Sequence, residues 1–363
     1  MFEQVMYVAK VPVDLEQLFE RFRGTQQALM VLVGEKAPVD LDELCAAATK
    51  SEAEVFGGIF PGVIFGGKCS SSGIVVASLR APVRVITVPN LEKPPQLELQ
   101  GTAVILLDGM ATSISSFLHT LFASTTAPTS FIGGGAGRLG HRKTPCLFSS
   151  QGVFCGGAVI AVSSAPVGVG IGHGWEAFLG PYVATSTEGP WLRELNWKPA
   201  FEVYTGAIGQ CCPQPLDALN FWSVSRRFPF GMARLDGSIV IRDPIRVEQD
   251  GSILVVGEVP ENSVLLLMKG EPEKLVLAAT EATKAACHNY VRRSQAKPRF
   301  ALVMDCVSRV VCTEEHMLDE LGAVEHTLPA GVQSFGFLTV GEVACADGYY
   351  LEFHNKTAVV GVC

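Results

Sequence analysis

One stretch of this chain contains no Asp, Glu, Lys or Arg, and it constrains the fold more than any other feature. It lies between Lys143 and Glu176 and is long enough to cross a bilayer as a helix. Glycines and Pro166 interrupt it and split its apolar residues into two short runs at 153–162 and 167–171. Short apolar runs bounded by such residues are typical of buried strands. The stretch therefore predicts a strand pair, and no membrane span is expected.

Composition and charge exclude several classes of protein. Of the 363 residues, 48% are hydrophobic and 18% are charged, which is typical of a globular chain with a large core. The formal net charge is -8, and the densest basic segments are pairs such as Arg226-Arg227. No basic stripe is present, so nucleic-acid binding is not expected. The 11 cysteines form no CxxC pair, so the sequence does not predict a zinc site.

The first residues do not resemble an export signal, because Glu3, Lys10 and Asp14 interrupt any apolar run. Scattered cysteines in a chain without such a signal are typical of a reducing compartment. We therefore expect a cytoplasmic protein that has no membrane partner.

The pattern of apolar residues predicts a mixed α/β fold with helices flanking the sheets. Asp40 is expected to cap the helix that follows it, and Pro272 suits the first turn of the longest helix. The segments at 82–100 and 133–137 are predicted to be a connector and a glycine-rich turn. The main expected strands are at 28–33, 55–60, 74–79, 103–107 and 300–305. The expected helices are at 41–50, 113–123, 200–208, 272–293 and 313–321.

Two pairs of segments repeat each other's order of elements. The strand, helix, glycine-containing strand and closing strand of 28–79 match those of 300–362, and 131–138 resembles 228–234. Two related halves with pseudo-two-fold organisation and intertwined ends would produce this pattern. Such halves leave a cleft between them, where ligands bind in many proteins. A chance similarity of glycine turns is the alternative.

Gly135, Gly137 and Gly140 have the spacing of a dinucleotide-binding loop. The residues that follow, 141–145, are a poor helix start, and no acidic residue stands about 20 positions further on. We therefore reject a dinucleotide site. These glycines either expose backbone N–H groups that bind an anion or form a plain tight turn.

Two histidines are candidates for ligand contact. His173 stands between glycines and two residues before Trp175, so a ligand has room to approach beside an aromatic wall. His354 precedes Asn355 at the end of an expected strand. For both histidines the alternative is a hydrogen-bonded side chain in a turn.

Glu342 lies in a glycine-bounded apolar segment, where a carboxylate must find a partner or shift its pKa. Arg309 and Asn355 are the candidate partners, and a structural ion pair between strands is the alternative. A catalytic role would need a nucleophile such as Cys306 and a base such as His354 within hydrogen-bonding reach. Nothing in the sequence shows that these two residues meet.

Several motifs occur in an order that resembles a known family. In the second half they are Phe228-Pro229-Phe230-Gly231-Met232, Ile241-Arg242-Asp243-Pro244, Asp305-Cys306-Val307-Ser308-Arg309, Thr339-Val340-Gly341-Glu342-Val343 and His354-Asn355-Lys356-Thr357. In the first half they are Gly133-Gly134-Gly135-Ala136-Gly137, Gly172-His173-Gly174-Trp175 and Asn196-Trp197-Lys198-Pro199-Ala200. Over 29–362 the chain resembles the FIST (F-box and intracellular signal transduction) family. The resemblance implies an N-terminal region at 1–208, a linker at 209–222 and a C-terminal region at 223–363.

The resemblance implies a sensory protein rather than an enzyme. The family is regarded as a module that senses small molecules such as amino acids. One branch resembles haem-binding nitric-oxide sensors, whose partners are histidine kinases or cyclic-di-nucleotide enzymes. Haem is therefore a candidate cofactor, with His173 or His354 as its iron ligand. Carried over by position, the expected ligand-binding residues are Gly134, Gly135, His173, Trp175, Cys306, Arg309, Glu342, Asn355 and Thr357.

The chain departs from the family pattern at two positions. Pro61 stands where the first half should repeat the polar residues around Glu342, and Arg138 ends the glycine-rich segment where relatives often have an acidic residue. We add Arg138 to the expected ligand-binding residues, because it could pair with an anionic ligand. Two alternatives to a sensor remain. One is a non-catalytic interaction scaffold with a degenerate pocket, and the other is an enzyme that uses Cys306 or Glu342.

Overall fold

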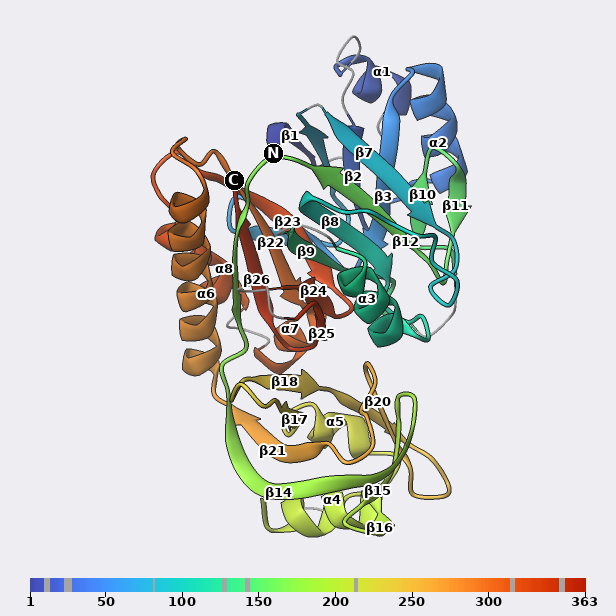
Figure 1. Ribbon diagram of the computed structural model, residues 1–363, viewed down its shortest axis with the longest axis vertical. Helices are drawn as coiled ribbons and strands as arrows, with labels where there is room; N and C mark the ends of the chain where they lie inside the picture. Colours follow the sequence, from blue (N-terminus) through green and yellow to red (C-terminus); the bar gives the residue numbers. More distant parts are fainter. Residues whose placement is uncertain are drawn as a thin grey trace.

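The computed structural model describes residues 1–9, 14–22, 28–80, 82–125, 129–140, 144–211, 215–313, 317–345 and 350–363. The chain forms a larger body made of three sheets and a smaller domain that lies below it in Figure 1. Among these residues, none of the helices combines the length and the apolar character needed to cross a membrane. The mixed α/β class predicted from the sequence is confirmed.

The body contains three six-stranded sheets with the same plan. The first runs β1 (Phe2–Val8), β6 (Ile74–Leu79), β2 (Ala28–Gly34), β3 (Glu54–Phe60), β10 (Leu147–Ser149) and β11 (Gly152–Phe154). The second runs β7 (Val83–Val88), β12 (Ala158–Ser163), β8 (Gly101–Asp108), β9 (Thr129–Ala136), β24 (Glu342–Ala344) and β25 (Glu352–His354). The third runs β13 (Gly168–Gly172), β26 (Ala358–Val362), β22 (Phe300–Cys306), β23 (Gln333–Thr339), β4 (Val63–Phe65) and β5 (Lys68–Ser70).

Each sheet is centred on one parallel pair of strands joined by helix. The pairs are β2 with β3, β8 with β9, and β22 with β23. The connecting helices are α2 (Leu41–Lys50), α3 (Ile114–Ala123), and the pair α7 (Val307–Thr313) and α8 (Met317–Thr327), while α1 (Leu15–Glu20) precedes β2. In every repeat the strand that closes the unit pairs antiparallel with the first strand of its parallel pair.

The three repeats interlock because each donates a hairpin to another sheet. The β4–β5 hairpin joins the third sheet, β10–β11 joins the first, and β24–β25 joins the second. This exchange explains the intertwined chain ends expected from the match between 28–79 and 300–362. The structure adds a third copy of the same unit, between β7 and β12, that the sequence analysis did not find.

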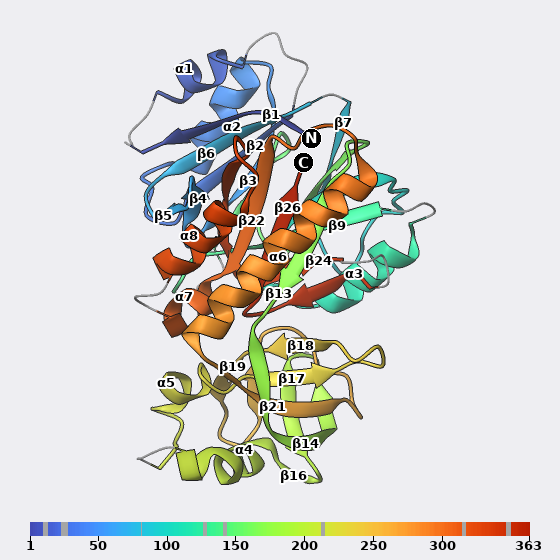
Figure 2. The same cartoon turned by 90° about the vertical axis from the view of Figure 1, so that its left-hand side faces the viewer.

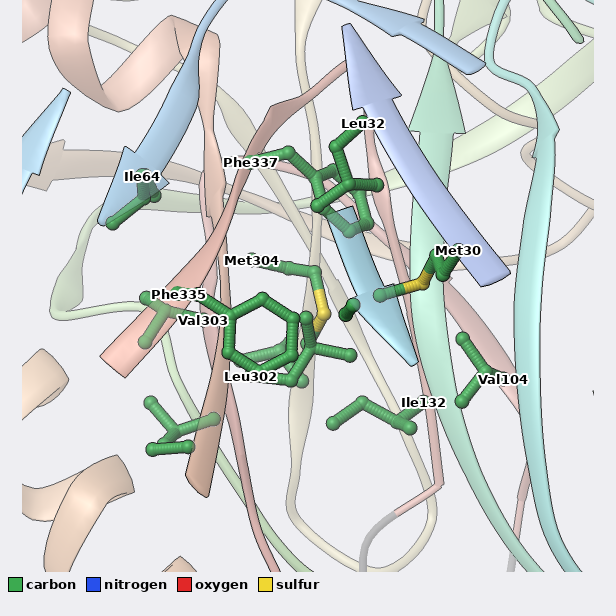
Figure 3. Packing of buried hydrophobic residues seen from close by; sticks show 14 of the residues in the cluster. Met30, Leu32, Ile64, Val104, Ile132, Leu302, Val303, Met304, Phe335 and Phe337 are labelled. Atoms are coloured by element: carbon green, nitrogen blue, oxygen red, sulfur yellow. The ribbon is translucent and has the colours of Figure 1, made fainter. Parts of the chain in front are cut away.

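A common apolar core lies where the three sheets face one another. Met30 and Leu32 from β2, Val104 from β8, and Leu302 and Met304 from β22 are all buried in one cluster (Figure 3). Alternate residues of a strand point to the same face, which places Met30 and Leu32 of β2 together on the side of this core. Burial of this apolar surface is the main force that holds the repeats together.

The smaller domain is built on an eight-stranded sheet with its own core. Its strands are β14 (Trp175–Glu188), β15 (Trp191–Leu195), β16 (Lys198–Pro199), β17 (Phe230–Ala233), β18 (Ile239–Arg242), β19 (Pro244–Val247), β20 (Ile253–Val255) and β21 (Val264–Gly270). Its helices are α4 (Ala200–Ile208), the short 3-10 helix η1 (Gly209–Cys211) and α5 (Phe221–Ser225). A separate cluster that includes Tyr204, Phe221 and Phe230 fills its interior.

The small domain is inserted into the third repeat. The chain enters it from β13 into β14 and returns from β21 into α6 (Pro272–Arg293), the long helix that packs across the third sheet (Figure 2). Gly168, Gly170 and Gly172 on β13 allow this packing, because a Cβ at Gly170 would lie 1.8 Å from the carbonyl oxygen of Ala282. We call the two connecting segments the crossings: the first is 173–174, between β13 and β14, and the second is residue 271, between β21 and α6. Both crossings adjoin the tightly packed pair of β13 and α6.

Local predictions succeeded where caps and periodicity were clear. The helices α2, α4 and α6 have the predicted bounds, and Asp40 Oδ1 accepts hydrogen bonds from the backbone N–H groups of Asp42 and Glu43. The predicted connector at 82–100 is wrong in part, because it contains β7. The predicted glycine turn at 133–137 is also wrong, since 133–136 belong to β9. The expected strand pair exists as strands, but β12 and β13 lie in different sheets.

Candidate functional site

Most of the predicted site residues meet at the junction between the third repeat and the small domain. Cys306 and Thr339 end the parallel strands β22 and β23, and they are directly opposite each other. Glu342 opens β24 beside them, and the segment 354–357 connects β25 to β26. Because parallel strands end at the same edge of a sheet, residues far apart in the sequence come together here.

Glu342 is buried and accepts hydrogen bonds through both carboxylate oxygens. The Thr339 hydroxyl donates to Oε1, and the backbone N–H of Thr357 donates to Oε2 at 3.2 Å. The Cys306 thiol also bonds to this carboxyl group. Burial raises the pKa of Glu342 to about 8, although these hydrogen bonds act in the opposite direction. At neutral pH the carboxyl group is therefore held mostly in its protonated form.

The Cys306 thiol is buried, and its sulfur lies 3.1 Å from the Ser308 hydroxyl. Burial and the neighbouring Glu342 raise the pKa of this thiol far above its ordinary value. A nucleophilic cysteine requires the opposite shift, because the thiolate is the reactive form. The chemistry of this cysteine suits packing and hydrogen bonding.

Arg309 organises the centre of the junction and is fully buried. Its Nε lies 3.0 Å from Glu320 Oε1 and 3.1 Å from Asp305 Oδ1. Its other nitrogens donate to backbone carbonyl oxygens of His173 at 2.6 Å, Lys356 at 3.0 Å and Leu275 at 2.9 Å. One guanidinium therefore binds two carboxylates and three separate segments of backbone, a use of its planar set of donors that lysine cannot reproduce.

Lys356 and Asp243 form a second buried ion pair, which reaches into the small domain. Lys356 Nζ lies 3.3 Å from Asp243 Oδ1 and donates to the carbonyl oxygen of Arg226 at 3.0 Å. The Asn355 side-chain oxygen accepts the backbone N–H of Asp243 at 3.2 Å, and the Thr357 hydroxyl donates to the Asn355 carbonyl oxygen at 2.7 Å. Residues 355–357 thus connect Glu342 to the small domain.

The two histidines lie at the same junction and are electrically neutral. Burial lowers the pKa of His173 to about 4, and Arg309 and His354 add to this effect. Burial also lowers the pKa of His354 to about 4. His173 Nδ1 accepts the backbone N–H of Trp175 at 2.9 Å, so in the neutral imidazole the proton is on Nε2. In this tautomer His173 has no ring lone pair free for a haem iron, so of the two neutral imidazoles His354 is the one whose donor chemistry fits.

Two of the predicted site residues, Gly135 and Arg138, form their hydrogen bonds outside this cluster. Gly135 forms backbone hydrogen bonds with the 340–341 turn, so it supports Glu342 rather than facing the other site residues. Arg138 donates from its side chain to the backbone carbonyl of Glu35, after β2. Gly134, by contrast, pairs in register with Glu342, and a Cβ there would lie 2.5 Å from Thr339 Cγ2.

Four charged residues of the cluster were missed from the sequence: Asp243, Asp305, Glu320 and Lys356 are all buried. Asp243, Asp305 and Lys356 stand inside the motifs quoted above, next to residues that were selected. Glu320 gives no such signal, because it lies in an ordinary charged helix. Across the described ranges, no group of three or more His, Cys, Asp or Glu side chains has the arrangement of a metal site.

An open cavity of about 460 Å³ lies elsewhere, beside β1 and α1. Its lining residues are Met6, Tyr7, Val8, Ala9, Asp14, Gln17, Leu18 and Arg21. None of the predicted site residues belongs to this lining, so the cavity is separate from the junction.

The fold and the junction define a class: an α/β protein of interlocked repeats, with an inserted domain and a buried polar cluster between the two. Comparison with family models then gives the family. Residues 28–198 match the FIST N domain and residues 200–345 match the FIST C domain. The chain belongs to the FIST family, as its motifs indicated. FIST domains are associated with signal transduction and with the sensing of small ligands.

Part of this chain is also similar in sequence to an individual relative. An uncharacterized protein of Methanocaldococcus jannaschii is 26% identical over 212 residues, which cover 53% of this chain and 40% of the relative. The matching part therefore spans about two fifths of that protein's length. The two family models meet near residue 199, and the division into 1–208, 209–222 and 223–363 stays a prediction.

Glu342 should make the stability of the protein depend on pH. Its folded pKa of about 8 lies above the ordinary carboxyl value, so between the two the native state holds a proton that the unfolded chain has released. The stabilising contribution of Glu342 is complete when the pH is below the ordinary carboxyl pKa, and it is lost as the pH rises through about 8. We expect the contribution of Glu342 to the free energy of unfolding to fall by about 1–2 kcal/mol between pH 6.5 and 8. Urea unfolding at several pH values measures this loss.

The matched variant is Glu342→Gln, which keeps the shape and removes the titration. The two buried histidines act in the opposite direction in this window, because their unfolded forms are still partly protonated near pH 6.5, but their effect is the same in both proteins and cancels in the comparison. Across the window Glu342→Gln should gain stability relative to the wild type by that same amount of about 1–2 kcal/mol. Equal slopes in the two proteins would show that Glu342 does not hold the proton.

Proposed function

We propose that this chain is a cytoplasmic sensor that binds a small ligand at the junction and passes the signal to a partner protein. One observation carries the proposal: a buried cluster of charged and polar side chains lies where the body meets the small domain. In this cluster Asp305 and Glu320 form ion pairs with Arg309, and Asp243 forms one with Lys356. The mostly protonated carboxyl group of Glu342 lies beside these pairs and binds the backbone of Thr357. A few convergent polar groups in an otherwise apolar setting are typical of ligand sites.

The energetic cost of this cluster supports a functional role. Buried ion pairs often contribute less to stability than apolar residues of the same size would, because both charges lose their water. The junction holds such pairs on both sides of Glu342. Perturbed pKa values and charge pairs together are a recognised mark of functional sites. The sensory role of the FIST family agrees with this interpretation.

The ligand class can be found by thermal stability measurements. A panel of amino acids and small anions would be tested on the wild type, on Glu342→Gln and on Thr357→Val. A true ligand at 100 times its dissociation constant should add about 2.7 kcal/mol to the wild type. We expect this gain to be reduced in both variants, because they alter the carboxyl group and the hydroxyl that link the cluster.

Arg193→Met is the matched control for this experiment. Arg193 forms exposed ion pairs with Glu188 and Asp250 inside the small domain, far from the cluster in its contacts. The control should bind like the wild type. A ligand that stabilises all four proteins equally would place its site away from the junction. A panel without any stabilising compound would reject amino acids and small anions as the ligand class.

Haem-based nitric-oxide sensing is the second candidate, and the neutral imidazole of His354 favours it, whereas ligation by His173 would first require its other tautomer. When bound, haem would supply the iron that binds the gas, and His173 or His354 would hold that iron. Protein purified from cells supplied with a haem precursor should then show a Soret band that His173→Ala or His354→Ala removes. A colourless protein would reject this version and leave the small-molecule sensor.

The remaining alternatives make different predictions. An enzyme that uses Cys306 would need a reactive thiolate, which its burial opposes. An interaction scaffold would bind its partner without any response to small molecules. For the sensor we expect a signalling partner such as a histidine kinase or a cyclic-di-nucleotide enzyme, whose affinity changes when the ligand is present. Co-purification with and without ligand distinguishes the sensor from the scaffold.

A further inference from the structure

The small domain is a self-contained unit joined to the body by two short crossings. Its main apolar cluster contains residues of β14–β21, α4 and α5, and the three main clusters of the body have their buried members outside that span. A domain with its own core and a polar interface is expected to move relative to its neighbour. Figures 1 and 2 show the two crossings side by side, beneath α6.

The first crossing touches the first turns of α6 at one glycine. Gly174 has a φ of 73°, and a Cβ there would lie 2.6 Å from the carbonyl oxygen of Lys274 and 2.9 Å from the Cα of Leu275. Arg309 binds the carbonyl oxygen of His173 in the first crossing and that of Leu275 in α6, shortly after the second crossing. A single buried side chain of the body therefore ties the first crossing to the start of the helix that follows the second.

The contacts between the two units are mainly polar. Arg242, at the end of β18, donates to the Phe353 carbonyl oxygen at 2.9 Å and to Glu352 Oε1 at 3.1 Å. Arg226 donates to the Val311 carbonyl oxygen at 3.0 Å. One small apolar cluster, which includes Trp175, Ile241, Met268 and Leu275, also lies at this junction. Polar interfaces of this kind separate more readily than a continuous apolar core.

Lys356 is the residue that spans the interface. Its backbone oxygen accepts hydrogen bonds from Arg309 and from Trp175 Nε1, while its Nζ reaches Asp243 and the Arg226 carbonyl in the small domain. It is fully buried and has a φ of 50°, which is unfavourable for a residue with a side chain. Such strain persists where the surroundings fix it and is concentrated at switches and functional sites.

We propose that the small domain is hinged at the two crossings and that the Lys356–Asp243 pair is the latch that keeps it closed on the body. Arg309 fixes this hinge on the body side, because it binds the first crossing at His173 and the start of α6 at Leu275, next to the second crossing. Opening would separate Lys356 from Asp243 and expose the polar cluster beside Glu342. This inference needs no ligand, so it stands or fails independently of the proposed sensory function.

Hydrogen exchange measured by mass spectrometry tests the latch in the ligand-free protein. The variants are Lys356→Met and Asp243→Asn, which remove one charge each with little change of shape, and Arg193→Met is the matched control. We expect amides of 240–243 and 353–358 to exchange at least tenfold faster in both latch variants. Amides of β15, α4 and β2 should keep their wild-type rates, and small-angle scattering should give a larger radius of gyration.

Two results would overturn the latch. Exchange that rises equally in both units would show a general loss of stability, and exchange unchanged at the junction would show that the pair does not hold the domains together. Asp243→Asn keeps the test usable if Lys356→Met does not fold, because asparagine keeps the size of the side chain. The Arg193→Met control should leave every peptide at its wild-type rate.

Discussion

Replacing Arg309 by methionine should lower the free energy of unfolding by about 4 kcal/mol, the range measured when one partner of a buried ion pair is removed. The variant leaves Glu320 and Asp305 buried without their cation, and the carbonyl oxygens of His173, Lys356 and Leu275 without this donor. Methionine fills similar space, so the loss reflects charge and hydrogen bonding rather than a cavity.

Two spectroscopic signals can follow this loss separately. The four tryptophans, Trp175, Trp191, Trp197 and Trp222, all belong to the small domain, so their fluorescence reports on that unit. Circular dichroism reports on the whole chain. Because Arg309 binds the first crossing and the start of α6 beside the second, we expect the fluorescence and circular dichroism transitions to shift to lower denaturant in Arg309→Met.

Comparison with other variants identifies the cause. Arg309→Lys keeps the charge but not the planar set of donors, so its loss should fall between those of the wild type and Arg309→Met. Arg193→Met removes exposed ion pairs and should cost less than about 1 kcal/mol. A loss below about 1 kcal/mol in Arg309→Met would contradict the central role assigned to this residue.

Most helices and strands, and the match between 28–79 and 300–362, could be predicted from the sequence. The middle repeat, between β7 and β12, could not be recognised. Strong signals such as the Asp40 cap and the apolar period of 272–293 depend on neighbouring residues, and so they could be recognised. The strand β7 was hidden among prolines, and β9 was mistaken for a turn because of its glycines. In the fold those glycines are needed for close packing, since a Cβ at Gly133 would lie 1.8 Å from the Ile105 carbonyl oxygen.

The candidate site could be predicted only in part, for a related reason. Glu342 could be selected because a carboxylate in an apolar, glycine-bounded segment stands out, and Cys306 and Thr357 could be selected from the resemblance to the FIST family. Glu320 could not, because a buried carboxylate in a helix has the same sequence signature as a surface one. Its burial depends on how α8 packs beside Arg309, and this long-range contact has no local pattern.

The backbone of the glycine-rich strand β9 supports the turn that precedes Glu342, so a substitution in this strand should lower the free energy of unfolding strongly. The Gly135 N–H donates to the Gly341 carbonyl oxygen at 2.7 Å, and its own carbonyl oxygen accepts the Val340 N–H at 2.9 Å. A Cβ at Gly135 would lie 2.1 Å from the Val340 carbonyl oxygen and 2.7 Å from the Gly109 Cα. Both neighbours are backbone atoms, which cannot rotate away.

Gly135→Ala should therefore lower the free energy of unfolding by about 3 kcal/mol, as expected for overpacking of a dense interior. The matched control is Gly206→Ala on α4, where a Cβ has nothing within 4 Å and alanine should stabilise the helix by about 0.5–1 kcal/mol. Because the added methyl group would displace the 340–341 turn that leads into Glu342, the pH dependence assigned to Glu342 should also weaken. A variant as stable as the wild type would show that Gly135 is free to accept a side chain, and it would return this glycine to the role of a ligand contact.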